Sequence, residues 1–150
     1  DSGKEFNIGP IGLAARDTLR LEMGFCLYGH DIDQTTHPLE AGLGWITKLD
    51  KGDFIGNAAI RAAKQKGLQR RLVGFTLNDR AFPRQGYPIH CNGSTIGAVT
   101  SGMFSPMLDK PIGMGYVGVE HAKPGAPVSI LIRNREIPAT VAVVPFITRK

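Results

Sequence analysis

The chain has 150 residues, which is enough for one ordinary domain or for one small domain and part of another. Hydrophobic residues make up 42% of the chain, as in soluble globular proteins, and no apolar run is long enough to cross a membrane. The net charge of +5 fits an ordinary basic surface or attraction to an anionic ligand. Because the basic residues are scattered and match no nucleic-acid-reading motif, we expect neither a membrane protein nor a nucleic-acid-binding protein.

The first third of the chain is predicted to be helices joined by loops. In chain order the expected elements are the end of a helix at residues 1–8, a helix at 12–23 stopped by Gly24, a polar loop at 30–37 and a short strand at 45–47. A helix end at the very start of the chain would lack a packing partner. We therefore expect the chain to be the later part of a longer protein.

A further helix is predicted at residues 57–66, where an alanine-rich run precedes Gly67. The segment at residues 64–71 reads KQKGLQRR and is polar and charged, as linkers between domains often are. We place a domain boundary there. Residues 1–68 are expected to form the last part of one domain, and residues 69–150 a second domain.

From residue 71 onward the spacing of hydrophobic residues changes to that of strands. The expected strands are residues 72–77, 87–91, 94–100, 112–120, 127–133 and 136–144. Asn92 and Gly93 favour a tight hairpin with a type I′ turn, and Asn134 marks another turn. The predicted fold is therefore α+β: the remnant of a mixed α/β domain followed by a small antiparallel β-barrel of about six strands.

The helix at 12–23 carries a dense group of charges. Arg16 and Arg20 are four residues apart and share a face, and Asp17 is positioned to pair with Arg20. Spacing alone favours a salt-bridge network that fixes the helix; the alternative is a guanidinium offered to a ligand carboxylate. Trp45, the only tryptophan, fits either a core position or the wall of a site for a flat ligand.

The polar loop holds four potential metal ligands, but their spacing fits no standard zinc or calcium site: His30, Asp31, Asp33 and His37. We expect these side chains to be solvated or to cap turns. Cys26 and Cys91 lack CxxC spacing and are expected to be reduced thiols. No metal site and no complete catalytic group is visible in the residue pattern.

Several motifs, in this order, resemble the aminomethyltransferase (T protein) of the glycine cleavage system. They are GLAARDTLRLEMGFCLYGHDID, HPLEAGLGWITKLDKGDFIG, RRLVGFTL, GSTIGAVTSGMFSPML, IGMGYVGVEHAKPG and the terminal VVPFITRK. From the first to the last, they span residues 12–150, which is nearly the whole chain. The resemblance implies the C-terminal portion of that enzyme: the last part of its folate-binding middle domain and its C-terminal barrel.

The resemblance also implies a reaction and its partners. In this family the lipoylated H protein carries an aminomethyl group, and tetrahydrofolate accepts the one-carbon unit to give 5,10-methylenetetrahydrofolate and ammonia. Arg16, in the AARD motif, matches an arginine that contacts folate, and Trp45, in the GLGW motif, matches an aromatic residue of the folate channel. We expect a monomer that needs no metal, in the cytoplasm of a bacterium or the mitochondrial matrix of a eukaryote.

The chain departs from the family pattern in three places. The family's catalytic aspartate, the glutamate of its GYTGE motif and a C-terminal tyrosine of some members have no match in these 150 residues. We therefore expect this chain alone to be inactive. The alternatives are the folate-binding part of a dimethylglycine or sarcosine dehydrogenase, a folate-dependent demethylase, or a non-catalytic module that binds folate or a protein.

Overall fold

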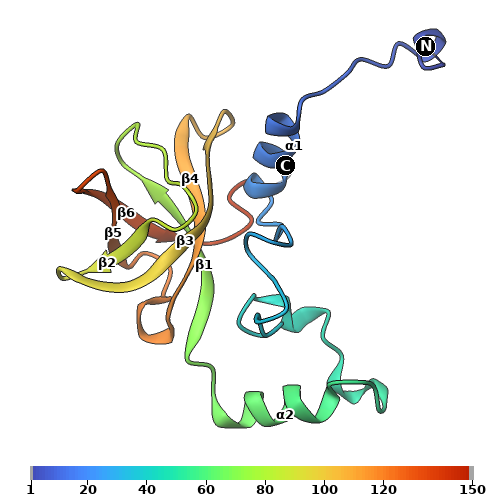
Figure 1. The fold of residues 1–150 in the computed structure, drawn as a ribbon, viewed down its shortest axis with the longest axis vertical. Helices are drawn as coiled ribbons and strands as arrows, with labels where there is room; N and C mark the ends of the chain where they lie inside the picture. Colours follow the sequence, from blue (N-terminus) through green and yellow to red (C-terminus); the bar gives the residue numbers. More distant parts are fainter. Residues whose placement is uncertain (1, 149–150) are drawn as a thin grey trace.

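The computed structural model describes residues 2–148. Asp1 and the terminal Arg149 and Lys150, on which the expectations about the two chain ends partly rest, lie outside the described residues. A closed β-barrel occupies one side of the molecule, and the helical N-terminal half lies along the other (Figure 1). None of the described helices is both long and apolar enough to span a lipid bilayer.

The N-terminal half contains two α-helices and three short 3₁₀ turns. The helices are α1 (Leu13–Glu22) and α2 (Asn57–Lys66), and the turns are Lys4–Phe6, Leu43–Trp45 and Leu49–Lys51. The prediction of a helix at residues 57–66 is thus confirmed at both ends, as is its stop at Gly67. α2 begins after Gly56, and no side chain caps its N-terminus.

The second half forms a closed barrel of six antiparallel strands. They are β1 (Arg70–Leu77), β2 (Pro88–Cys91), β3 (Ser94–Ser105), β4 (Lys110–Gly118), β5 (Pro127–Ile132) and β6 (Arg135–Ala142). Around the barrel the order is β1-β4-β3-β2-β5-β6, and β6 closes the ring by pairing with β1. A fourth 3₁₀ turn, Val119–His121, follows β4. The predicted α+β fold with a barrel of about six strands is confirmed.

Two of the barrel hairpins have tight turns that the sequence predicts. Asn92 and Gly93 have φ of 51° and 76°, the two positive values that a type I′ turn requires. Arg133 and Asn134 repeat this geometry between β5 and β6, with φ of 49° and 61°. The turn predicted at Asn92-Gly93 and the turn at Asn134 are both confirmed.

Alternation along the strands separates an inner and an outer set of hydrophobic residues. The barrel interior is filled by buried side chains from all six strands: Val73, Phe75, Leu77, Ile89, Val99, Val117, Val128, Ile130, Ile137, Ala139 and Val141. A second cluster contains Leu21 of α1 together with Ile112 and Met114 of β4, and Met103 and Phe146 pack against it. The last turn of α1 and the C-terminal tail therefore cover the part of the barrel's outer face around β4.

Gly74 on β1 marks where the C-terminal tail crosses the barrel. A β-carbon at Gly74 would lie only 2.6 Å from Cγ1 of Val144 and 2.8 Å from Cζ of Phe146. The backbone amide of Phe146 donates a hydrogen bond to the carbonyl oxygen of Glu22, at 2.9 Å. The tail is thereby held between β1 and the end of α1.

Two secondary-structure predictions for the N-terminal half are wrong. The segment at residues 45–47 is not a strand: Gly42 turns the chain with φ of 75°, and the amides of Ile46 and Thr47 bond back to the carbonyl of Leu43. No strand edge within residues 2–148 pairs with this segment. Residues 2–8 form the 3₁₀ turn Lys4–Phe6 and no α-helix, and the side chains of this turn are exposed.

The seam between β2 and β5 is the shortest in the barrel, with two residue pairs. Polar side chains from four strands reinforce it. His90 Nδ1 lies 2.8 Å from Glu136 Oε1, His90 Nε2 lies 3.0 Å from the Thr95 hydroxyl, and the Ser129 hydroxyl donates to Glu136 Oε2 at 3.0 Å. The hydrogen bonds from His90 and then from Ser129 hold the pKa of Glu136 below its usual value.

We expect Glu136→Gln to lower the free energy of unfolding at neutral pH. Because the folded-state pKa is the lower one, the stabilisation is complete above the unfolded pKa of about 4.3 and is lost as the pH falls through the folded pKa. Urea denaturation of the wild type and the variant at pH values on both sides of this range should show a difference that shrinks in acid. Glu5→Gln, on the exposed Lys4–Phe6 turn, is the control, and a Glu136 difference that is constant with pH would contradict the linkage.

Candidate functional site

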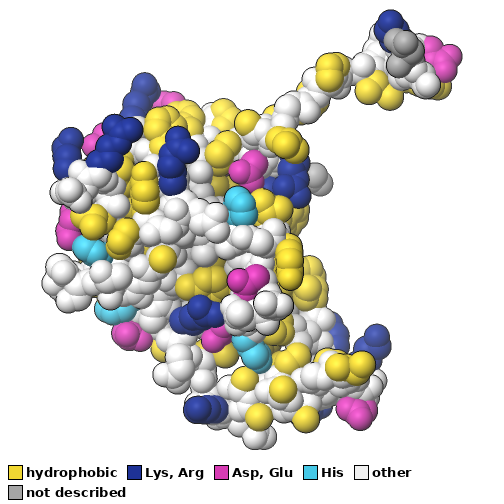
Figure 2. Space-filling view, viewed as in Figure 1, with side chains coloured by type: hydrophobic (Ala, Val, Ile, Leu, Met, Phe, Trp, Pro, Cys, Tyr) yellow, Lys and Arg dark blue, Asp and Glu magenta, His cyan; other side chains and the backbone are white. Residues whose placement is uncertain are grey.

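An open cavity of about 540 Å³ lies between the N-terminal half and the barrel. Its size falls within the range of small-molecule sites. All of its walls are apolar or glycine, and they come from four parts of the chain: Met23, Gly24, Phe25, Cys26 and Ile32 after α1; Ala41, Gly42, Leu43 and Trp45; Leu72, Val73 and Met114 of the barrel; and Val144 and Pro145 of the tail. Hydrophobic side chains gather on this side of the molecule, between α1 above and α2 below (Figure 2).

Trp45 lines this cavity, and 73% of its surface is exposed. A large aromatic side chain this exposed contributes little to the core of the described residues, so it is available to stack on a flat ligand. Arg16 is also exposed, but it lies on α1 about two turns before the cavity wall begins and is not part of the lining. Within residues 2–148 its guanidinium forms no hydrogen bond or ion pair. The roles of Arg16 and Trp45 remain predictions.

The turn that ends α1 places the residues after it in the cavity wall. Gly24 has φ of 67°, its amide bonds to the carbonyl of Leu21, and the amide of Phe25 bonds to the carbonyl of Arg20 at 2.8 Å. This pair of bonds is a Schellman motif, for which glycine is the preferred residue. The predicted stop at Gly24 is confirmed, and it places Phe25 and Cys26 directly against the cavity.

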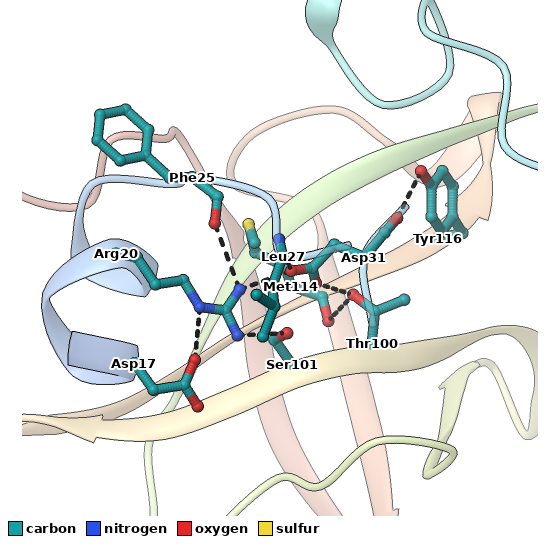
Figure 3. Close-up of polar contacts among 9 residues, drawn as sticks. All are labelled: Asp17, Arg20, Phe25, Leu27, Asp31, Thr100, Ser101, Met114 and Tyr116. Carbon is teal, nitrogen blue, oxygen red and sulfur yellow. Dashed lines mark hydrogen bonds and ion pairs between the residues drawn. The ribbon is translucent and has the colours of Figure 1, made fainter. Parts of the chain in front are cut away.

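Arg20 lies behind this wall and links three parts of the molecule (Figure 3). Only 8% of the residue is exposed. Its Nε donates to Asp17 Oδ1 at 2.6 Å, its Nη1 to Asp31 Oδ2 at 2.5 Å and to the Phe25 carbonyl at 3.3 Å, and its Nη2 to the Ser101 hydroxyl at 2.9 Å. The predicted pairing of Asp17 with Arg20 is confirmed. Of the two arginines of α1 within the described residues, Arg20 is the one that forms salt bridges.

Asp31 is the acidic centre of the network, with 1% of its surface exposed. Its Oδ2 accepts from Arg20 and from the Leu27 amide at 2.9 Å, and its Oδ1 accepts from the Thr100 hydroxyl at 2.5 Å. Both carboxylate oxygens are therefore paired, as a buried charge requires. The expectation that Asp31 is solvated is wrong, because its carboxylate is buried in an ion pair; its bond to the Leu27 amide does cap the turn at residues 27–31.

A bulge in β3 lets the barrel reach this network. Against β4, Val99 pairs with Gly115 and Ser101 with Met114, so Thr100 is the extra residue. Consecutive side chains of a regular strand point to opposite faces, whereas a bulge changes that alternation. Thr100 and Ser101 thus both contact the N-terminal half. Nothing in the sequence pattern indicates this bulge, which is why the contribution of Thr100 and Ser101 to the network could not be predicted.

Tyr116 of β4 connects the barrel to the loop at a further point. Its hydroxyl donates to the carbonyl oxygen of Asp31 at 3.0 Å, and the guanidinium of Arg70 lies 4.7 Å from the centre of its ring. Burial, followed by the neighbouring Cys26, raises the pKa of Tyr116 to about 12. The phenol therefore keeps its proton at neutral pH and continues to donate to Asp31.

The other polar residues of the loop behave as predicted. Asp33 Oδ1 accepts from the amide of Thr35 at 2.7 Å, and hydrogen bonds from Thr35 and then Thr36 lower the pKa of Asp33. His37 Nδ1 accepts from the Leu39 amide at 3.2 Å, so both residues cap turns. Among the described residues no three histidine, cysteine, aspartate or glutamate side chains come together as a metal site would require.

Comparison with known proteins matches two family models to the chain. Residues 1–51 match the GCVT N-terminal domain, and residues 70–147 match the glycine cleavage T-protein C-terminal barrel domain. Among curated proteins, the chain is 56% identical over 147 residues to the aminomethyltransferase of Halothermothrix orenii, covering 98% of this chain and 41% of that protein. It is 52% identical to the aminomethyltransferase of Flavobacterium psychrophilum, covering 97% of this chain and 41% of that protein.

The solved structures agree with the sequence comparison. The glycine cleavage system aminomethyltransferase T from Bartonella henselae is 40% identical and superposes with a TM-score of 0.89, over 97% of this chain and 41% of that one. The chain therefore spans about two fifths of the length of the relatives it matches, at 41%.

We expect Cys26 to be a poorly reactive thiol although it lines the cavity. Burial, followed by the negative charge of Asp31, raises its pKa above the ordinary value, so the thiolate is scarce at neutral pH. In a Cys91→Ser background, iodoacetamide at about pH 8 should alkylate folded Cys26 at least about tenfold more slowly than the chain unfolded in urea. Equal rates in the two states would contradict this.

Proposed function

The chain belongs to the glycine cleavage T-protein family, and we propose that it is the folate-binding C-terminal part of an aminomethyltransferase. In the full-length protein, tetrahydrofolate would accept the one-carbon unit from the aminomethyl group on the lipoylated H protein. The products would be 5,10-methylenetetrahydrofolate and ammonia. The aminomethyltransferase names of the relatives favour this function over that of a folate-dependent dehydrogenase or demethylase.

The observation that carries this proposal is the apolar cavity with the exposed indole of Trp45 at its wall. Tetrahydrofolate has a planar pyrimidinone ring and an aromatic p-aminobenzoyl group, which favour apolar surroundings and stacking on a tryptophan. It also has glutamyl carboxylates, which favour an arginine. Bound in this site, tetrahydrofolate would supply the amine nitrogens that accept the one-carbon unit.

The residues of this chain then have binding roles. Trp45 would stack on an aromatic part of the ligand, and the apolar walls would exclude water from it. Arg16 would contact the glutamyl carboxylates or another polar part of the folate, because its guanidinium is exposed and has no partner among residues 2–148. The chain supplies no match to the family's catalytic aspartate, and we propose no catalytic residue in it.

The cellular setting follows from the same proposal. The full-length protein would act as a monomer, without a metal, in the cytoplasm of a bacterium or in the mitochondrial matrix of a eukaryote. The domain boundary at residues 68 and 69 likewise remains a prediction.

Arg16→Ala in the full-length protein should weaken tetrahydrofolate binding. A hydrogen bond to a charged group contributes about 1.5–3 kcal/mol, so the dissociation constant should rise at least about tenfold. Isothermal titration calorimetry measures this directly. Arg135→Ala, at an exposed position in the β5–β6 hairpin, is the matched control and should bind as the wild type does. An unchanged dissociation constant for Arg16→Ala would assign Arg16 no part in folate binding.

The 150-residue chain alone should show no aminomethyl transfer, since nothing in it matches the family's catalytic aspartate. The assay supplies tetrahydrofolate and the aminomethyl-loaded H protein and follows methylenetetrahydrofolate. The full-length protein is the positive control. Product formation above background by the 150-residue chain would show that its own residues suffice for the chemistry.

A further inference from the structure

The cavity wall that follows α1 has almost no regular structure of its own. Residues 24–32 contain one isolated bridge, between Tyr28 and Ile32, and no helix or strand. Four of them nevertheless line the cavity: Gly24, Phe25, Cys26 and Ile32. A wall of this kind keeps its shape only if other groups hold its backbone.

Arg20 and Asp31 hold that backbone at two points. Arg20 Nη1 donates to the carbonyl oxygen of Phe25, and Asp31 Oδ2 accepts from the amide of Leu27. Cys26, which lines the cavity, lies between Phe25 and Leu27 in the chain. The ion pair thus fixes the backbone on both sides of a lining residue.

The same two side chains connect the wall to the barrel. Arg20 donates to Ser101 and Asp31 accepts from Thr100, at the bulge of β3, and Tyr116 holds the carbonyl of Asp31 (Figure 3). The barrel carries the opposite side of the cavity, through Leu72, Val73 and Met114. The network therefore sets the separation between two walls of the cavity.

The chemistry of the pair fits positioning better than stabilisation. Replacing a buried ion pair by well-packed apolar residues of similar volume is often neutral or stabilising. An arginine side chain instead fixes geometry, because the donors of its planar guanidinium hold several acceptors at set angles. Here one guanidinium orients Asp17, Phe25, Asp31 and Ser101 together.

We propose that Arg20 and Asp31 are positioning residues for the cavity: they hold residues 24–32 against the barrel in the arrangement that binds the one-carbon carrier. This inference rests on the proposed function, in which that carrier is tetrahydrofolate. Neither side chain lines the cavity, so each acts through the wall that it holds.

The test compares variants of the full-length protein. Arg20→Met keeps much of the side-chain volume but loses the guanidinium, and Thr100→Val removes one hydroxyl bond to Asp31 with little change in shape. The dissociation constant for tetrahydrofolate should rise about tenfold or more in Arg20→Met and by a smaller factor in Thr100→Val. The KM for tetrahydrofolate should rise while kcat changes little, since the reacting groups are untouched.

Met103→Ala is the matched control for general destabilisation. Met103 lies on β3 and packs against the same outer cluster as Leu21, but it does not line the cavity. It should lower the melting temperature without raising the dissociation constant. An equal rise in the dissociation constant for Met103→Ala and Arg20→Met at matched loss of stability would overturn the positioning role, as would unchanged binding in folded Arg20→Met and Thr100→Val.

Alkylation of Cys26 in a Cys91→Ser background gives a readout that needs no ligand. The loosened wall should react several-fold faster in Arg20→Met and Thr100→Val than in the parent, at temperatures well below unfolding. Unchanged alkylation rates would overturn the inference even if binding fell. If the wild type fails to bind tetrahydrofolate while the alkylation rates rise, the proposed function fails and the positioning of the wall stands.

Discussion

The ion pair between Arg20 and Asp31 joins the two halves of this molecule. Only the last turn of α1 is buried, so the helix has little apolar surface with which to dock on the barrel. Leu21 makes that apolar contact. The Arg20–Asp31 pair beside it fixes the orientation of the helix end through hydrogen bonds to Thr100 and Ser101. The cavity exists where it does because these contacts hold residues 24–32 at a set distance from β1 and β4.

Arg16 and Arg20 belong to the same charge pattern on α1 but have different surroundings. Arg16 and Arg20 share a face of α1, but the barrel and the loop cover only the last turn of the helix. Arg20 is therefore enclosed and bonded to protein groups, whereas Arg16, one turn earlier, projects into open space. The salt-bridge interpretation and the ligand interpretation of this charge pattern apply to different arginines, and the ligand interpretation of Arg16 remains a proposal.

Local rules account for the parts that could be predicted from sequence. The alanine-rich run of α2, the stop at Gly24, the Asn92-Gly93 turn and the strand periodicity all depend on neighbours in the chain. The segment at residues 45–47, predicted as a strand, fits a strand or a turn equally well by its apolar residues, and only the absence of a strand edge to pair with among residues 2–148 decides between them. The partners of Asp31 come from residues up to 85 positions away, and they reach it through a bulge that no local pattern marks.

We propose that the cavity between the loop after α1 and the barrel binds tetrahydrofolate. A crystal structure of the full-length protein with tetrahydrofolate tests it most directly. We expect an aromatic part of the folate stacked on Trp45, a polar group of the folate within hydrogen-bonding distance of Arg16, and the Arg20–Asp31 pair intact behind the wall. Folate bound elsewhere, with the cavity filled by side chains from another part of the protein, would contradict it.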